Sequence, residues 1–126
     1  MKILLLDDEE MVRKSLQRTL VLINHEVDCF SSAKDAAVAI ENGGYDFALI
    51  DYKMPEFSGI WFMKNANIPR KTKVLLITAF VNREVITEIM RLGACGYLIK
   101  PFNENELKMH LAFHSQKVPI SAVDTL

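Results

Sequence analysis

The sequence predicts one α/β domain, a doubly wound parallel sheet of five strands flanked by five helices. Two observations predict this class. Five short apolar runs alternate with five stretches of helical periodicity along the 126 residues. The apolar runs also lack regular polar alternation, which indicates strands that are buried on both faces, as in a parallel sheet covered by helices. Successive βα units of this kind are joined by right-handed crossovers.

The predicted strands are the short apolar runs, which are typical of buried strands and end in polar residues or turns. We expect strands at residues 2–7, 26–30, 46–50, 73–78 and 95–99. The stretches between them place apolar residues three or four positions apart, which is typical of amphipathic helices. We expect these helices at residues 9–23, 32–42, 58–66, 82–92 and 103–115.

Two of the predicted helices carry signals at both ends. Ser31-Ser32 opens the second helix and Gly43-Gly44 ends it, while Asn82 opens the fourth and Gly93 ends it. Serine and asparagine accept hydrogen bonds from the free N–H groups of a helix start. Glycine readily adopts the left-handed conformation that often follows a helix end. These signals support the predicted helix boundaries.

The length and periodicity of the chain indicate one domain at residues 1–116. Residues 117–126 contain Pro119 and lose the periodicity, so we expect a tail or the stub of a linker there. The chain could continue into an output domain in a longer parent protein, or end. The sequence does not decide between these alternatives.

The composition is that of an ordinary globular domain, with 50% hydrophobic residues, 25% charged residues and a net charge of −1. Without a basic excess, we expect no direct binding of nucleic acid by this domain. No apolar run approaches the ~20 residues of a membrane span, and no signal peptide is recognisable. Cys29 and Cys95 form no CxxC motif and fit a reducing compartment better than a disulfide scaffold. We therefore expect a cytoplasmic protein.

Polar residues close four of the apolar runs. Asp7-Asp8 follows the first run, Asp51 the third, Thr78 the fourth and Lys100 the fifth. Since parallel strands end at the same edge of a sheet, these groups are expected to meet there, beside the point where the strand order reverses. Three carboxylates, a hydroxyl and an ammonium at one place favour the binding of a hard cation and of a phosphoryl group.

The chemistry of such a cluster follows from its oxygen ligands. Mg²⁺ is usually bound through one or two carboxylates and several waters. Asp8 and Asp51 could supply the carboxylates, and Asp7 could hold a water. A carboxylate is also a nucleophile toward phosphorus, and Asp51 is the best candidate because it stands alone. Thr78 and Lys100 would contact the phosphoryl oxygens, one by hydrogen bond and one by charge. No P-loop pattern is present.

Four motifs, in order, give the chain a resemblance to a known family. They are Leu6-Asp7-Asp8, the segment from Ile50 to Pro55 with Gly59, Ile77-Thr78-Ala79, and the segment from Tyr97 to Phe102. Over residues 1 to 116 the chain resembles the receiver domains of two-component response regulators. The resemblance implies a flavodoxin-like sheet in the order 2-1-3-4-5. It also implies a role in phosphorelay signalling.

The resemblance assigns a role to each residue of the cluster. Asp51 accepts a phosphoryl group from a histidine kinase or phosphotransfer protein, with Thr78 and Lys100 assisting. Mg²⁺ is held by Asp7, Asp8, Asp51 and the main-chain carbonyl of Lys53. The Lys100–Pro101 bond is expected to be cis. The domain is then a phosphoacceptor switch, not an enzyme, and catalyses only its own phosphorylation and dephosphorylation.

The resemblance further implies a switch. Phosphorylation draws Thr78 toward the phosphoryl group while the ring of Tyr97 turns inward, which remodels the face made by residues 82–92, 95–99 and 103–115. Partners, or a second copy in a homodimer, would dock on this face. Lys53 and Phe80 lie two residues after Asp51 and Thr78, where residues influence the lifetime of the phosphate. We hypothesise that Phe80 limits water access and lengthens this lifetime.

Three other functions remain as alternatives. A phosphatase with an aspartyl nucleophile typically needs a second acid two residues later, where this chain has Lys53. A constitutive interaction module would keep the fold without phosphorylation, and the complete set of site residues argues against it. Flavin binding would need a phosphate-cradling loop after the first strand, where Asp7-Asp8-Glu9-Glu10 would repel phosphate. We expect His110 and His114, one helical turn apart, to be an ordinary partly exposed pair.

Overall fold

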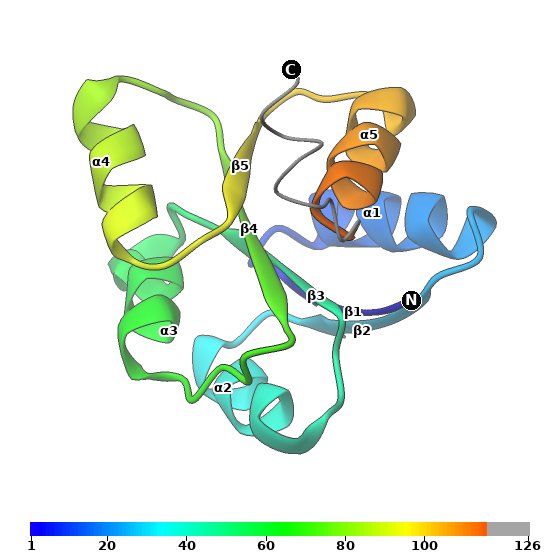
Figure 1. Cartoon of the computed structure of the whole chain (residues 1–126), viewed down its shortest axis with the longest axis horizontal. Helices are drawn as coiled ribbons and strands as arrows, with labels where there is room; N and C mark the ends of the chain where they lie inside the picture. Colours follow the sequence, from blue (N-terminus) through cyan, green and yellow to red (C-terminus); the bar gives the residue numbers. More distant parts are fainter. Residues whose placement is uncertain (116–126) are drawn as a thin grey trace, which may run out of the picture.

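The computed structural model describes residues 1–115 as a parallel β-sheet between two layers of helices (Figure 1). The strands are β1 (Lys2–Leu6), β2 (Glu26–Phe30), β3 (Phe47–Asp51), β4 (Lys73–Thr78) and β5 (Gly96–Ile99). The helices are α1 (Glu10–Leu22), α2 (Ala33–Asn42), α3 (Ser58–Asn65), α4 (Arg83–Arg91) and α5 (Glu104–Ser115). The predicted fold class is confirmed, and most predicted boundaries differ by no more than one residue.

The sheet has the order β2-β1-β3-β4-β5, with every neighbouring pair parallel. The predicted order is therefore confirmed. The chain leaves β1 for β2 on one side and later returns to place β3 on the other side of β1. In doubly wound sheets this reversal opens a crevice at the carboxyl ends of the strands, where ligands bind. The groups that follow β1 and β3 flank this crevice.

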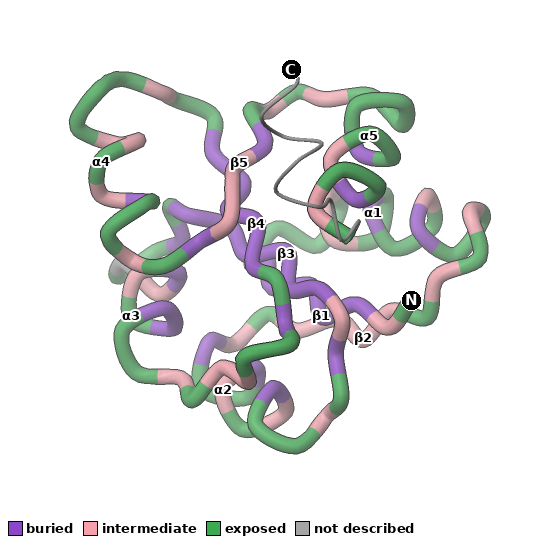
Figure 2. Tube along the Cα trace, in the orientation of Figure 1, coloured by how far each residue is buried: buried purple, intermediate pink, exposed green. Residues whose placement is uncertain are grey.

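Two hydrophobic cores lie on opposite faces of the sheet, because successive strand residues point to opposite faces. Leu4 and Leu6 of β1 pack in the core that α2, α3 and α4 cover, whereas Ile3 and Leu5 pack in the core under α1 and α5. Figure 2 shows the buried positions concentrated along the central strands and the exposed positions on the outer faces of the helices. This burial on both faces explains the uninterrupted apolar runs of β1, β3 and β4.

The predicted helix caps are present. The hydroxyl of Ser32 accepts a hydrogen bond from the N–H of Asp35, and the side chain of Asn82 accepts one from the N–H of Val85. Gly44 and Gly93 adopt positive φ angles of 68° and 92° after α2 and α4. Both helices therefore begin and end where their capping residues predict.

A short 3-10 helix, η1 (Pro55–Phe57), links β3 to α3 and was not predicted. Glu56 within it has a positive φ of 60°. Immediately afterwards, α3 passes so close to the end of β3 that a Cβ atom at Gly59 would lie 2.0 Å from the carbonyl oxygen of Asp51. The glycine therefore permits α3 to pack against the strand that ends in Asp51.

The structure also bears on the predictions about the cysteines, membrane-spanning segments and the tail. Cys29 and Cys95 are both free, as predicted. None of the helices described here is long and apolar enough to cross a membrane. The predicted tail at residues 117–126 lies outside the described residues, so that prediction stays open.

Candidate functional site

The carboxyl edge of the sheet brings the three predicted carboxylates together. Asp7 follows β1, Asp51 is the last residue of β3, and Asp8 lies beside Asp7. One carboxylate oxygen from each lies within 4.8 Å of the other two. Asp7 is fully buried and Asp51 is 4% exposed, whereas Asp8 is exposed. Two of the three carboxylates are thus buried, and the third is exposed to solvent.

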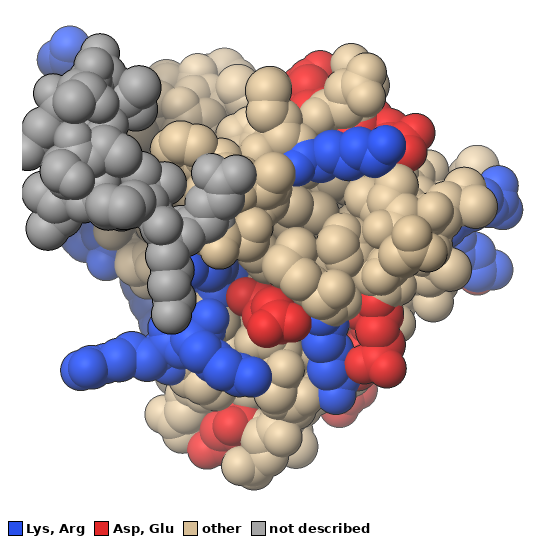
Figure 3. Space-filling model, turned by 45° about the vertical axis from the view of Figure 1, so that its right-hand side comes forward, with Lys and Arg blue, Asp and Glu red and all other residues tan. Residues whose placement is uncertain are grey.

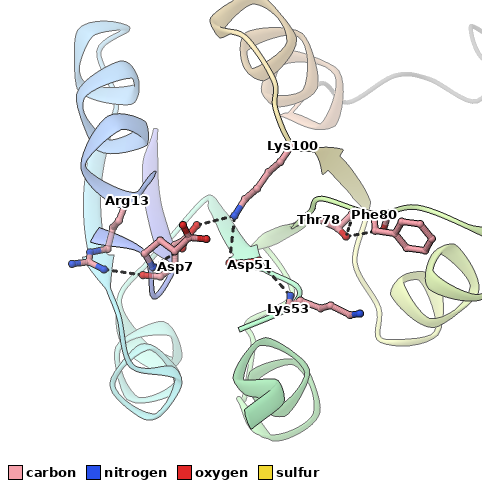
Figure 4. A network of polar contacts seen from close by, with 8 residues as sticks. Asp7, Arg13, Asp51, Lys53, Thr78, Phe80 and Lys100 are labelled. Atoms are coloured by element: carbon pink, nitrogen blue, oxygen red, sulfur yellow. Dashed lines mark hydrogen bonds and ion pairs between the residues drawn. The ribbon is translucent and has the colours of Figure 1, made fainter. Parts of the chain in front are cut away.

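Asp7 is held on several sides (Figure 4). Its N–H donates to the carbonyl of Phe30 at 3.1 Å, which ties it to β2. Its Oδ1 accepts the N–H of Glu9 at 2.9 Å. Its main-chain carbonyl accepts a hydrogen bond from Nη1 of Arg13 at 2.9 Å. The contact with Arg13 was not predicted from the sequence, because an arginine one turn into a helix most often faces solvent.

Lys100 bridges the two buried carboxylates, and Figure 4 shows its side chain reaching between them. Its Nζ lies 3.4 Å from Oδ2 of Asp7 and 3.4 Å from Oδ2 of Asp51. The side chain of Lys100 is only 21% exposed. The Lys100–Pro101 peptide bond is cis, and the N–H of Lys100 donates to the carbonyl of Thr78 at 2.8 Å. The ammonium therefore reaches the cluster from the end of β5.

The electrostatics of the cluster follow from this burial. Desolvation raises the pKa of Asp51 from 3.8 to about 6, and the nearby charge of Asp7 adds to the increase, although Lys100 opposes it. Burial alone would lower the pKa of Lys100, but the carboxylates of Asp51 and Asp7 outweigh burial and raise it. Lys100 is consequently a cation, while Asp51 is a carboxylate whose ionised form lacks part of its stabilisation.

Lys53 contributes its backbone to the site. Its N–H donates to Oδ1 of Asp51 at 3.3 Å, while its exposed side chain points away from the carboxylate in Figure 4. Just before it, the N–H of Tyr52 donates to the carbonyl of Ile77 at 2.8 Å, which holds the start of this loop to β4. The role of the Lys53 carbonyl as a metal ligand stays a prediction.

Thr78 lies at the end of β4 and is buried, but its hydroxyl is turned toward the following loop. The hydroxyl donates to the carbonyl of Phe80 at 2.9 Å and accepts the N–H of Phe80 at 3.2 Å. The ring of Phe80 is 61% exposed and points away from Asp51 (Figure 4). Tyr97 on β5 is half-buried and packs against the core below α4. Neither Thr78 nor Phe80 directs its side chain at Asp51 in this conformation.

The residues of the cluster fit a hard divalent cation. Three carboxylates with oxygens within 4.8 Å of one another repel each other, and a cation would offset that repulsion. Mg²⁺ prefers carboxylate oxygens and water molecules as ligands. The cluster offers the carboxylates, and its exposed side at Asp8 is open to water. His110 and His114 lie away from this edge on α5, with ring centroids 6.1 Å apart. They do not join the carboxylates.

Comparisons with known proteins agree with this geometry. The model of the family described as "Response regulator receiver domain" matches residues 3–112. Chemotaxis protein CheY-3 of Vibrio cholerae is 37% identical over 120 residues, which cover 88% of each chain. Regulatory protein AtoC of Escherichia coli is 35% identical over 109 residues, which cover 86% of this chain and 24% of AtoC. The chain spans half of the length of transcriptional regulatory protein TcrA of Mycobacterium tuberculosis, at 35% identity.

Solved structures share the fold. Chemotaxis protein CheY4 of Vibrio cholerae superposes with a TM-score of 0.82 at 28% identity, covering 89% of this chain and 96% of that one. A CheY-like receiver domain from Methanospirillum hungatei gives a TM-score of 0.81 at 26% identity, covering 90% and 92%. With the matched family model and the carboxylate edge of the sheet, these relatives identify the chain as a member of the response regulator receiver domain family of two-component signalling.

Proposed function

We propose that this receiver domain accepts a phosphoryl group on Asp51, in the presence of Mg²⁺, from a histidine kinase or phosphotransfer protein. The observation that carries the proposal is the environment of Asp51. Its carboxylate lies within 3.4 Å of the Lys100 ammonium and beside the carboxylates of Asp7 and Asp8. Asp51 thus has a cation that can stabilise phosphoryl oxygens on one side and ligands for a metal on the other.

The transfer is a substitution at phosphorus. A carboxylate oxygen of Asp51 attacks the phosphorus, the P–N bond of the donor phosphohistidine breaks, and its electron pair returns to the imidazole nitrogen. Lys100 offsets negative charge on the phosphoryl oxygens, which is the main way proteins assist such a step. Bound Mg²⁺ would supply further positive charge at the same oxygens. Asp7, Asp8, Asp51 and the Lys53 carbonyl are the residues that would hold it.

The switch would start at Thr78. Its hydroxyl now bonds to the backbone of Phe80, and a phosphoryl group on Asp51 would offer it a charged acceptor instead. Charge-assisted hydrogen bonds are about twice as strong as neutral ones. Release of Phe80 would let the loop before α4 move, and Tyr97 could then turn inward. We infer that such movement couples Asp51 to the face of α4, β5 and α5.

That face supports a protein-interaction output. It carries large apolar side chains that are exposed, namely Met90 on α4, Ile99 on β5, and Met109 and Phe113 on α5. Exposed apolar side chains grouped on one face are typical of protein-binding surfaces. A phosphorylation-dependent homodimer through this face is the proposed output. Light scattering with and without phosphodonor tests it, since an unchanged mass would contradict dimerisation.

A groove beside Lys100 supports docking of the phosphodonor. It has a volume of about 570 Å³ and is lined mostly by apolar side chains of α1, together with Ala79, Pro101 and Phe102. Lys100 lines the same groove, so an apolar surface of the donor protein packed there would bring its phosphohistidine close to Asp51. On the face drawn in Figure 3, acidic and basic side chains are interspersed. Because Lys100 is the one charged residue among those that line the groove, apolar contact would contribute more to docking there than charge.

The experiment that tests the proposal uses a small-molecule acyl phosphate as phosphodonor. The chain is incubated with the donor and Mg²⁺, and its intact mass is measured. We expect a gain of one phosphoryl group, because Asp51 has both the ammonium of Lys100 and the carboxylates of Asp7 and Asp8 beside it. Asp51→Asn should show no gain.

Two controls separate the proposal from its alternatives. Omission of Mg²⁺ with a chelator should prevent the gain in mass if the three carboxylates act through the metal. A chain that gains no phosphoryl group under any condition would contradict the proposal and favour a constitutive interaction module. A gain that persists in Asp51→Asn would mean that another residue is the acceptor.

A further inference from the structure

Arg13 occupies an unusual position on α1. Its guanidinium Nη1 donates to the main-chain carbonyl of Asp7 at 2.9 Å. Among residues 1–115, no carboxylate oxygen lies within 4.0 Å of this guanidinium. Figure 4 shows Arg13 on the side of Asp7 opposite Lys100. Burial raises the pKa of Cys29 on β2, and the positive charge of Arg13 opposes that increase in part.

The accepting carbonyl belongs to the peptide that joins Asp7 to Asp8. Because a peptide unit is planar, fixing its carbonyl also fixes the direction in which the chain enters Asp8. The other polar groups of Asp7 are held by Phe30, Glu9 and Lys100. Asp8 is exposed, so the direction of its carboxylate depends on the backbone that carries it. The hydrogen bond from Arg13 therefore orients the backbone of Asp8, whose carboxylate is exposed and is not held by surrounding groups as those of Asp7 and Asp51 are.

We propose that Arg13 is a positioning residue for the metal site, holding the Asp7–Asp8 peptide so that the Asp8 carboxylate points at the same cation as Asp7 and Asp51. This inference rests on the proposed binding of Mg²⁺. Residues that orient metal ligands commonly contribute 10- to 100-fold to metal affinity. The guanidinium itself touches neither the cation nor the phosphoryl group.

The charge of Arg13 and its proposed positioning role predict opposite effects of its removal on the affinity for Mg²⁺. A positive guanidinium near three carboxylates opposes the binding of a cation, so if charge alone mattered, its removal would strengthen Mg²⁺ binding. If Arg13 positions the ligands, its removal weakens binding. Arg13→Gln removes both the positive charge and the guanidinium group that donates to the Asp7 carbonyl. Lys14→Gln is the matched control, because it removes the same charge one residue later from an exposed ion pair with Glu10.

The test measures the dissociation constant of Mg²⁺ by calorimetry for the full chain and its variants, together with unfolding temperature in chelator. We expect Arg13→Gln to bind Mg²⁺ about tenfold more weakly or worse, with an unfolding temperature in chelator close to that of the wild type. Arg13→Lys should lie in between, and Lys14→Gln should match the wild type. At saturating Mg²⁺ the rate of phosphorylation of Arg13→Gln should recover, since only the metal affinity is impaired.

Each other outcome has a defined meaning. Equal or tighter Mg²⁺ binding by Arg13→Gln, while the wild type binds, overturns the role of Arg13 and leaves the proposed function intact. Unfolding of both Arg13 variants in chelator also overturns it, because the guanidinium would then support the fold. Failure of the wild type to bind Mg²⁺ overturns the proposed function, and this inference with it.

Discussion

At the scale of single residues, the chemistry of this domain depends on how the protein treats the charge of Asp51. The carboxylate is 4% exposed and shares its surroundings with a second buried carboxylate, and its pKa rises to about 6. Lys100 compensates only in part. Additional positive charge, which Mg²⁺ would bring, would therefore stabilise the ionised carboxylate, and the proposed phosphorylation would convert it into an acyl phosphate, a mixed anhydride.

The raised pKa of Asp51 predicts a change in stability with pH. The folded chain favours the protonated carboxyl of Asp51. The free energy of unfolding of the metal-free protein should therefore fall as pH rises from 3.8 to about 6, and stay at its lower value above that range. Asp51→Asn cannot ionise. Above the pKa of Asp51 it should exceed the wild type in free energy of unfolding by up to about 3 kcal/mol in chelator.

The measurement is denaturant unfolding in chelator across this pH range. The two proteins should converge at low pH, where the wild-type carboxyl is protonated. As a control, Asp35→Asn removes an exposed carboxylate from α2 and should follow the wild-type pH dependence. A constant difference between Asp51→Asn and wild type at all pH values would contradict this electrostatic account.

Phe80 carries the prediction about lifetime. Its ring points away from Asp51 here, so it can restrict water only after Thr78 releases the Phe80 backbone and the loop rearranges. We expect Phe80→Ala to lose the phosphoryl group faster than the wild type, because the smaller side chain leaves the site open. A time course of dephosphorylation after removal of the donor measures this. Equal rates in the two proteins would end the idea.

At the scale of elements, the junction of β3 and α3 is the tightest point of the site. Gly59→Ala would place a Cβ atom 2.0 Å from the carbonyl oxygen of Asp51, where only the backbone could give way. We expect it to lower the free energy of unfolding by about 3 kcal/mol, because overpacking that forces backbone shifts has about this cost. It should also weaken Mg²⁺ binding, since the strand end must move. Denaturant unfolding and calorimetry measure both effects.

Gly93→Ala provides the comparison for Gly59→Ala. Nothing lies within 4 Å of a Cβ atom at Gly93, but its φ is 92°. The substitution should therefore cost about 1–2 kcal/mol from the left-handed backbone alone and leave Mg²⁺ affinity unchanged. If the two glycine variants lost the same stability and the same metal affinity, close approach at Gly59 would not be the cause.

The packing of α5 on β5 predicts a pH dependence of a different kind. His114 packs against Gly96, where an added Cβ atom would lie 2.9 Å from Nε2 of the ring. Burial lowers the pKa of His114 below 6.5, and the charges of His110 and Lys73 lower it further. Folding therefore favours the neutral ring, and stability present above pH 6.5 is lost as pH falls through the lower, folded-state pKa.

His114→Gln tests this packing. The variant has no titrating ring, so its unfolding temperature should fall less than that of the wild type as the solution is acidified below pH 6.5. Thermal unfolding followed by circular dichroism gives both curves. Parallel curves for the two proteins would show that His114 does not contribute to acid sensitivity.

The elements themselves were largely predictable from local sequence. Buried strands on both faces leave uninterrupted apolar runs, and the capping bonds of Ser32 and Asn82 depend on residues three positions apart. The 3-10 helix at Pro55–Phe57 could not be predicted in this way, because the positive φ of Glu56 has no glycine to signal it. Nor could the contact of Arg13 with Asp7, which depends on how α1 lies against the end of β1.

At the scale of the whole molecule, the parallel topology is what assembles the site. Asp7, Asp51, Thr78 and Lys100 are far apart in the chain, yet the order β2-β1-β3-β4-β5 carries them to one edge. The sequence motifs therefore predicted which residues would meet. They did not predict side-chain direction: the Thr78 hydroxyl turns to Phe80, and the Lys53 side chain turns to solvent. Such directions depend on the loops between elements, where sequence periodicity carries no information.

The central claim is that Asp51, assisted by Mg²⁺, is the single phosphoacceptor, and localisation of the modification tests it most directly. After phosphorylation by an acyl phosphate, borohydride reduction converts an aspartyl phosphate to homoserine, and peptide mass spectrometry identifies the residue. The account predicts homoserine at position 51 with Mg²⁺ and none with chelator. Homoserine at another position, or an unmodified residue 51 with Mg²⁺ present, would contradict it.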